Sequence, residues 1–258
     1  MKTQWMMGLS CLTMLVLFLS VFTGTAEATV VWSDNFDDGN YDGWTILGYN
    51  STTLEPIAGN FSAASGMLTS LDDDVNIARY TSTMTVGTWS FDLFVPDDDN
   101  NVGSIDVMFT SNGTRPFPHY SSLTVSFEAW YDQNRFDLWE LRGNNQGILL
   151  DHFVPAGIEG WWNVIVTRSN VGHYKVYING TLRMDVVNND VTGSDYLEFF
   201  CWNVTGAAID NIVVYDEIWP TTTPTTTAPP PDARILLMIV GVGVAVLVII
   251  AIVCLRRK

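Results

Sequence analysis

Two tryptophans and two carboxylates occupy alternate positions of one predicted hairpin, a combination suited to holding sugars. Glu128 and Trp130 precede a candidate turn at Gln133-Asn134, and Asp137 and Trp139 follow it. With this turn Trp130 lies opposite Asp137. Glu128 then lies opposite Trp139, so that all four side chains project from one face. We predict a ligand-binding platform for glycans there; the alternative is that loops or another sheet cover both tryptophans and make them core.

The histidines and serines of the chain do not occur in the sequence motifs typical of catalytic sites. His119, His152 and His173 form neither an H-E-x-x-H nor an H-x-H group, so the sequence gives no basis for zinc chemistry. No G-x-S-x-G sequence indicates a serine nucleophile. We therefore predict that the protein is not an enzyme.

The segments that hold the tryptophans and carboxylates of this hairpin are predicted to be β-strands. Apolar and polar residues alternate with a period of two, and no segment between the two ends of the chain shows a convincing helical pattern. Asn179-Gly180 is a tight-hairpin signal between two such runs. Without helices to cover a parallel sheet, about a dozen strands predict two antiparallel sheets packed face to face, a jelly-roll sandwich. The clearest alternating runs are 89–95, 105–109, 123–131, 162–166, 174–178 and 208–214.

The two ends of the chain predict a membrane-anchored surface protein. A basic start, an apolar run and an A-E-A sequence predict a cleaved signal peptide over 1–28, and the alternative is a retained N-terminal helix. The uncharged segment 235–255 is long enough to cross a bilayer, and the basic tail 256–258 favours the cytoplasm. Residues 220–232 are a Thr/Pro-rich stalk. We predict a single-pass type I protein of the cell membrane, with one ectodomain, 29–219, outside.

Charge and cysteine content narrow the functional classes. The chain has 12 Lys and Arg against 28 Asp and Glu, a net charge of −16, which disfavours nucleic acid as a partner. Of three cysteines only Cys201 lies in the predicted ectodomain, which excludes a disulfide within it. The ectodomain also has five predicted N-glycosylation sites, at Asn50, Asn60, Asn112, Asn179 and Asn203.

Three stretches carry a family resemblance. The chain opens with D-N-F-D-D-G at 34–39 and D-G-W at 42–44. A late hairpin reads W-N-V-I-V at 162–166 and Y-K-V-Y-I-N-G at 174–180, and A-I-D-N-I-V-V-Y at 208–215 closes the domain. Together they resemble the concanavalin A-like lectin/glucanase superfamily, the laminin-G-like jelly rolls. The resemblance covers the whole ectodomain, but it specifies fold better than function, because the superfamily includes lectins, adhesion modules and glycosidases.

The resemblance also implies a structural calcium ion. Some glycan-binding modules of this kind hold Ca²⁺ between a carboxylate near each terminus, and hard oxygen ligands suit that ion. Here Asp34, Asp37 or Asp38 would come from the start of the domain and Asp210 from its end. The alternative is that the acidic residues only form a turn.

A glycosidase of this superfamily carries a compact E-x-D-x-E or E-x-D-x-x-E motif on one strand. That motif is absent, and the nearest approach, E-A-W-Y-D at 128–132, has the wrong spacing. We therefore predict a non-enzymatic surface protein whose ectodomain binds an extracellular glycan or glycoprotein. The alternatives are a structural or adhesive protein that contacts other proteins, and a divergent glycoside hydrolase.

Overall fold

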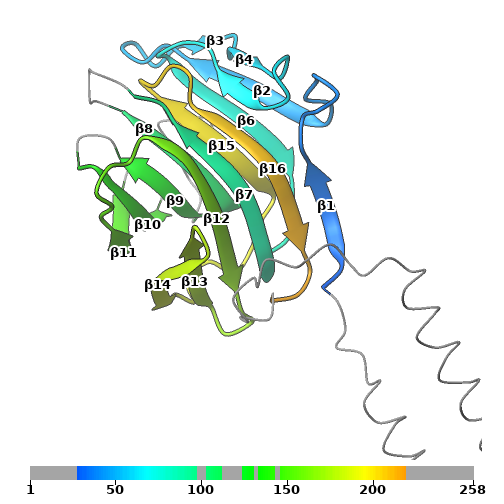
Figure 1. Cartoon of the computed structure of the whole chain (residues 1–258), viewed down its shortest axis with the longest axis vertical. Coiled ribbons are helices and arrows are strands. Elements are labelled where there is room, and N and C mark those ends of the chain that lie inside the picture. Colours follow the sequence, from blue (N-terminus) through cyan, green and yellow to red (C-terminus); the bar gives the residue numbers. More distant parts are fainter. Residues whose placement is uncertain (1–27, 98–102, 112–123, 131–132, 143–145, 219–258) are drawn as a thin grey trace, which may run out of the picture. The chain divides into compact units, whose positions relative to one another are not determined.

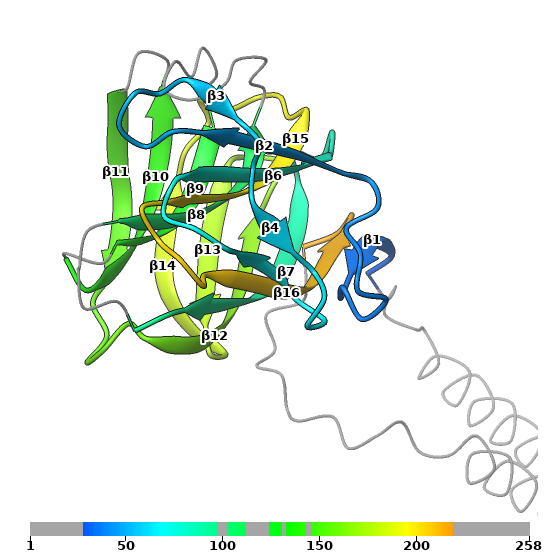
Figure 2. The same ribbon diagram turned by 90° about the horizontal axis from the view of Figure 1, so that it is seen from above.

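The computed structural model describes residues 28–97, 103–111, 124–130, 133–142 and 146–218. Within these residues all regular structure is β-strand, and every strand pair is antiparallel. Figures 1 and 2 show the strands in two layers, with the chain crossing repeatedly between them. The all-β sandwich predicted from the alternating sequence pattern is therefore confirmed.

The first sheet combines strands from the start, the middle and the end of the described chain. Its order brings β7 and β16, which are far apart in sequence, side by side. From one edge to the other it consists of β14 (Thr181–Val187), β13 (His173–Ile178), β12 (Gly160–Arg168), β7 (Gly87–Val95), β16 (Ala208–Tyr215), β5 (Leu68–Ser70) and β4 (Phe61–Ser62), while β1 (Val30–Asp34) pairs with β16.

The second sheet holds the hairpin with the candidate binding residues. Two consecutive hairpin strands lie beside a strand from the middle of the chain and one from near its end. Its order is β11 (Gln146–Phe153), β10 (Arg135–Arg142), β9 (Thr124–Trp130), β8 (Ser104–Ser111), β15 (Tyr196–Trp202), β6 (Val75–Thr81), β2 (Trp44–Tyr49) and β3 (Pro56–Ile57).

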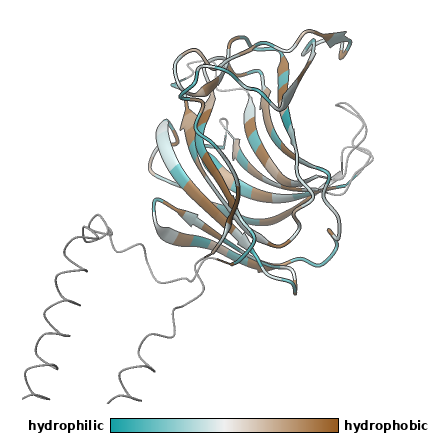
Figure 3. Ribbon diagram, turned by 90° about the vertical axis from the view of Figure 1, so that its right-hand side faces the viewer, coloured by the Kyte–Doolittle hydropathy of each residue, from teal (hydrophilic) through white to brown (hydrophobic). Residues whose placement is uncertain are grey.

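One hydrophobic core fills the space between the sheets. Trp89 and Phe91 of β7 meet Phe109 of β8 and Phe127 of β9, and all four are at most 1% exposed. Figure 3 shows hydrophobic and hydrophilic segments alternating along the strands. Because successive strand residues point to opposite faces, the residues between these core positions must lie on the outer faces of the sheets.

The hairpin between β13 and β14 has the predicted turn. Asn179 has a φ of 49° and Gly180 one of 73°, and Ile178 pairs with Thr181. Positive φ at both central residues is what a two-residue hairpin turn with the twist of the flanking strands requires.

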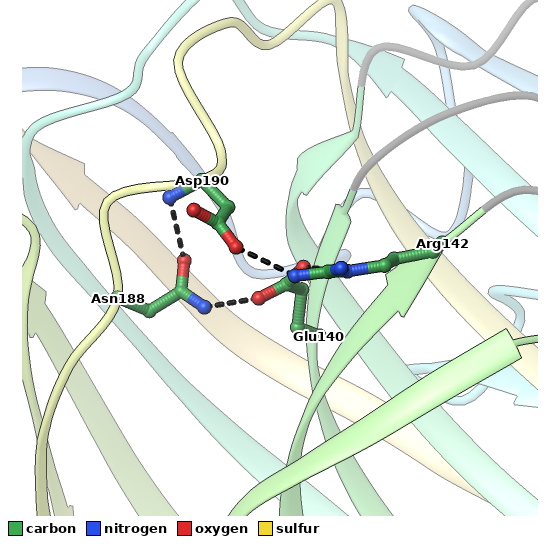
Figure 4. Close-up of polar contacts among 4 residues, drawn as sticks. All are labelled: Glu140, Arg142, Asn188 and Asp190. Carbon is green, nitrogen blue, oxygen red and sulfur yellow. Dashed lines mark hydrogen bonds and ion pairs between the residues drawn. The ribbon is translucent and has the colours of Figure 1, made fainter.

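A polar network joins β10 of the second sheet to the segment after β14 of the first sheet (Figure 4). Glu140 is 1% exposed, forms an ion pair with Arg142 and accepts a hydrogen bond from Asn188. Arg142 also lies 2.6 Å from the carboxylate of Asp190, whose backbone N–H donates to Asn188. The network gives the buried Glu140 carboxylate the partners that burial demands and connects the two sheets.

Candidate functional site

Three acidic residues lie side by side on the outer face of the second sheet. Asp106 on β8 pairs with Glu128 on β9, and Glu128 pairs with Asp137 on β10. Directly opposed residues on antiparallel strands have Cβ atoms about 5 Å apart. We call Asp106, Glu128 and Asp137 the carboxylate row; it is continued by Phe200 of β15 on one side and by His152 of β11 on the other.

The row is buried although it lies on an outer face. Asp106, Glu128 and Asp137 are only 5%, 7% and 0% exposed. Burial penalises the charged form of a carboxyl group, and neighbouring negative charges penalise it further. The residues that cover the row therefore decide its chemistry.

Hydrogen bonds fix the two ends of the row differently. Asp106 accepts hydrogen bonds from the hydroxyl of Ser126 (2.7 Å) and from that of Ser104 (3.1 Å). Asp137 accepts from Arg135 Nε, which lies 2.8 Å from one carboxylate oxygen and 2.9 Å from the other. One end of the row is thus paired with a cation, and the other is held by neutral hydroxyls.

These surroundings raise the pKa of all three carboxyl groups. Burial raises the pKa of Asp106 to about 6, against the opposing hydrogen bonds from the two serines. Burial, together with the charges of Asp106 and Asp137, raises the pKa of Glu128 to about 10. Burial also raises the pKa of Asp137, although Arg135 opposes the shift. At neutral pH the central carboxyl group, Glu128, therefore holds its proton and can donate a hydrogen bond.

Aromatic side chains surround a cleft above the row. Trp130 and Trp139 are half-buried, Trp202 is 36% exposed, and Phe200 is buried. The cleft has a volume of about 230 Å³. It is lined by Ser104, Asp106, Met108, Glu128, Trp130, Trp139, Leu141, Gly147, Phe200 and Trp202.

The indole of Trp139 is held in a defined position. Its Nε1 donates to Asp137 Oδ2 at 3.1 Å, which ties the ring to the carboxylate row. On β11, a Cβ atom added to Gly147 would lie 3.2 Å from the Trp139 ring. The missing side chain of Gly147 therefore gives this ring its place on the cleft wall.

The structure brings the four predicted binding residues together, but in a different register. Glu128, Trp130 and Trp139 line one cleft, and Asp137 accepts a hydrogen bond from the indole of Trp139. The predicted pairing was wrong by two residues, because Asp137 pairs with Glu128 and Trp130 pairs with Arg135. β9 ends at Trp130 and β10 begins at Arg135, so the connection has four residues instead of two. A shift by an even number of residues keeps every side chain on its face, which is why the predicted grouping survives.

Sequence reasoning missed the part of the cleft that β8 and β15 supply. Asp106 alternates with the core residues Ile105 and Val107, which places it on the outer face. That signal was present, but which strand Asp106 faces depends on long-range pairing. Phe200 and Trp202 come from β15, which pairs with β8 across about 90 residues of sequence and so gives no local signal.

The predicted calcium ligands have other partners in the described chain. Asp34 accepts a hydrogen bond from Trp44 Nε1 (2.9 Å), and Asp38 accepts one from a backbone N–H two residues later (3.1 Å). Burial is the largest influence raising the pKa of Asp210, and the charges of Asp37 and Asp34 add to it. In the described ranges no group of three or more His, Cys, Asp or Glu side chains is arranged to hold a metal ion. Calcium binding stays a prediction.

Four of the five predicted glycosylation sites lie in the described residues. Asn60 and Asn179 are exposed, while Asn50 and Asn203 are half-buried, and Asn112 falls outside the described residues. Exposure of the asparagine is needed for attachment of a glycan, and glycosylation itself stays a prediction.

The described part of the chain has no helix with the length and apolar character needed to cross a membrane. Nearly all of the predicted signal peptide (1–28), the stalk (220–232), the membrane segment (235–255) and the tail (256–258) lie outside it. These assignments stay predictions.

Comparisons with known proteins establish the fold and leave the family open. No protein-family model and no curated protein matches the sequence. Among solved structures, a Bacillus subtilis protein of unknown function with a galectin-like fold is 12% identical, with a TM-score of 0.55 over 74% of this chain and 97% of that one. The catalytic domain of an endo-1,3-β-glucanase (laminarinase) from Thermotoga petrophila is 14% identical, with a TM-score of 0.52 over 75% and 99% of the two chains.

A third similar structure is a Bacillus licheniformis β-glucanase, 14% identical, with a TM-score of 0.53 over 74% of this chain and all of that one. At such low identities the similarity shows the fold alone. The fold of the chain is therefore similar to the galectin-like fold of the first of these structures.

Proposed function

We propose that the cleft on the outer face of the second sheet binds glycans. The observation that carries this proposal is the meeting of Trp130, Trp139 and Trp202 around a cleft whose floor contains Asp106 and Glu128. Binding sites for small ligands combine apolar walls with a few convergent polar groups that fix orientation, and this cleft has that composition.

The chemistry of the cleft matches that of a sugar ring. The C–H face of a pyranose is apolar and can lie against an indole, while its hydroxyl groups need both donors and acceptors. Glu128 with its proton is a donor, and the ionised form of Asp106 is an acceptor. The same fold in proteins named as glucanases supports carbohydrate as the ligand class.

A second candidate function, glycoside hydrolysis, is favoured by the carboxylate row. Glycosidases use two carboxyl groups, one protonated and one ionised, on either side of the scissile bond. Burial holds the proton on Glu128 and leaves Asp106 with a pKa of about 6, a combination that separates an acid from a base. These groups come from different strands, so a search for a motif on one strand could not find them. Release of reducing sugar from a bound glycan, lost in Glu128→Gln, would establish this function over binding alone.

We also propose that the domain acts outside the cell, carried by a single membrane segment. Two separate features of the sequence support one topology: the apolar N-terminal run with its A-E-A sequence, and the uncharged segment 235–255 followed by a basic tail. The bilayer would then be a second partner, through the C-terminal segment.

A glycan array with full-length protein tests the binding proposal. The protein is purified in a detergent without a sugar headgroup, because such a headgroup would compete for the cleft. We expect binding to at least one glycan class, lost in Trp130→Ala and in Trp202→Ala. Trp161→Ala is the matched control, because Trp161 is an exposed tryptophan (48%) whose ring contacts Phe94 of the first sheet in a tilted arrangement.

The decisive comparison is between glycan binding by the two cleft variants on the second sheet and by the control variant on the first sheet. Equal loss of binding in Trp161→Ala, or unchanged binding in both cleft variants, would contradict the proposed site. Near-UV circular dichroism on each variant separates loss of binding from loss of fold.

A further inference from the structure

The carboxylate row is short of positive charge. Arg135 pairs with Asp137 at one end of the row. Among the described residues no cation forms an ion pair with Asp106 or Glu128, and the groups hydrogen-bonded to these two are serine hydroxyls. Buried ionised carboxylates are normally paired with a cation or a metal. Glu128 meets this requirement by holding its proton, whereas Asp106, with a pKa of about 6, is ionised at neutral pH without a cation partner.

The other charged groups near the row do not supply that partner. His152 continues the row beyond Asp137, on the far side from Asp106, and its side chain is exposed. On β15, the neighbouring carboxylate Glu198 is paired with Arg79. The opening of the cleft is therefore the direction from which a cation can reach Asp106 and Glu128.

The walls of the cleft also favour a cation. Trp130, Trp139 and Trp202 line it together with the two carboxyl groups. The face of an indole ring attracts an ammonium group through its quadrupole, and tryptophan does so best among the aromatic residues. Aromatic walls above an acidic floor are thus complementary to a ligand that has both an apolar ring face and a positive charge.

We propose that the sugar bound in the cleft carries a primary ammonium group, as in a glucosamine unit of a deacetylated glycan, and that this group sits against Asp106 and Glu128. The inference rests on the proposed function, since it names the class of glycan. With about 230 Å³, the cleft is smaller than the roughly 300–1,000 Å³ of sites for drug-sized ligands, so it takes one sugar unit.

Binding of such a ligand has a measurable consequence. An ammonium group favours the ionised form of a nearby carboxyl group, and burial keeps Glu128 protonated in the free protein. Binding of the ammonium group therefore lowers the pKa of Glu128, and protons are released to solvent as that pKa falls toward the pH of the solution. A neutral sugar leaves this proton in place.

Titration calorimetry of the full-length protein at pH 7 tests the proposal with three probes. These are a glucosamine disaccharide, its N-acetylated form and a polyamine without a sugar ring, each measured in two buffers of different ionisation enthalpy. We expect the amine disaccharide to bind about tenfold tighter than the acetylated one, as one additional charge-assisted hydrogen bond permits. We also expect its binding enthalpy to depend on the buffer, which reports proton release.

Glu128→Gln is the decisive variant, because glutamine keeps the shape of the protonated side chain but cannot ionise. It should abolish the proton release from Glu128 and reduce the preference for the amine, while leaving binding of the acetylated disaccharide within about threefold. The preference that remains comes from Asp106, which is ionised at pH 7. Glu159→Gln, which changes an exposed carboxylate in the loop before β12, is the matched control and should change neither. If Glu128→Gln does not fold, Asp106→Asn replaces it, and the comparison of the two disaccharides on the unaltered protein remains decisive.

Each other outcome overturns the inference in a distinguishable way. Equal affinity for the two disaccharides, or binding of neutral glycans alone, overturns the ammonium site and leaves the proposed function standing. Binding of the polyamine as tightly as the amine disaccharide shows an amine site that does not recognise sugar. Absence of binding to any glycan on the array overturns the proposed function together with the inference.

Discussion

Replacing Asp106 with asparagine tests the carboxylate row through the stability of the folded domain. Asp106 is 5% exposed, and burial raises its pKa from 3.8 to about 6. An acidic group whose pKa is raised by folding binds its proton more tightly in the folded state than in the unfolded one. Folding stability is therefore lost as the pH rises through the interval between these two values.

The size of this effect follows from the two pKa values. Below about pH 4 the group is protonated in both states, and above about pH 6 it is ionised in both. Each tenfold difference in proton affinity corresponds to about 1.4 kcal/mol, so the wild type loses at most about 3 kcal/mol between these limits. Asparagine cannot ionise, but it loses part of the hydrogen bonding to Ser104 and Ser126, which offsets about 1 kcal/mol.

Urea unfolding of residues 29–219, followed by tryptophan fluorescence between pH 4 and pH 7, measures this difference. We expect Asp106→Asn to be more stable than the wild type at pH 7 by about 2 kcal/mol, with the gain disappearing toward pH 4. Asp73→Asn, which alters an exposed loop carboxylate, controls for the general loss of one negative charge. A variant that is less stable than the wild type at pH 7 by the same amount as at pH 4 would refute the proposed burial of an ionised carboxylate.

Three further predictions concern other parts of the chain. Glu140→Ala should destabilise the domain by about 2–4 kcal/mol in the same assay, because it leaves Asn188 and Arg142 without their shared acceptor; an effect below 1 kcal/mol would contradict the network. If Asp210 helps to hold calcium, a chelator should lower the melting temperature and Asp210→Ala should remove that sensitivity; an identical melting curve with chelator argues against the ion. The fragment 29–219 should be soluble and folded in the absence of detergent, and its retention in the membrane fraction would show that the predicted domain limits are wrong.

The fold could be predicted because its signal is local. Strands β7 and β12 each show apolar residues at every second position, and one buried face fixes which residues point inward. The positive φ angles at Asn179 and Gly180 are likewise predicted by these two adjacent residues alone. Such features need no knowledge of the neighbouring strand, and they are confirmed by the structure.

Only the part of the site that lies on a single hairpin could be predicted from the sequence. Alternation along the strands predicts that Glu128 and Trp139 lie on the same face. This holds although the predicted turn is too short, because a register shift of two residues leaves each side chain on its face. The row depends on Asp106 lying beside Glu128, and the cleft depends on Trp202 of β15 lying beside β8. Pairing between strands so far apart in sequence is decided by packing of the whole core, which no local pattern encodes.

The stability and the binding predictions constrain one another. The row lies outside the core between the sheets, and its buried charge opposes folding. Replacing Asp106 should therefore strengthen the fold while it weakens ammonium binding, two changes of opposite sign from one substitution. A residue that served only structure would lower both, because loss of fold would carry the binding with it. Measuring both quantities on Asp106→Asn thus separates a ligand-binding carboxylate from an incidental one, even before the natural ligand is known.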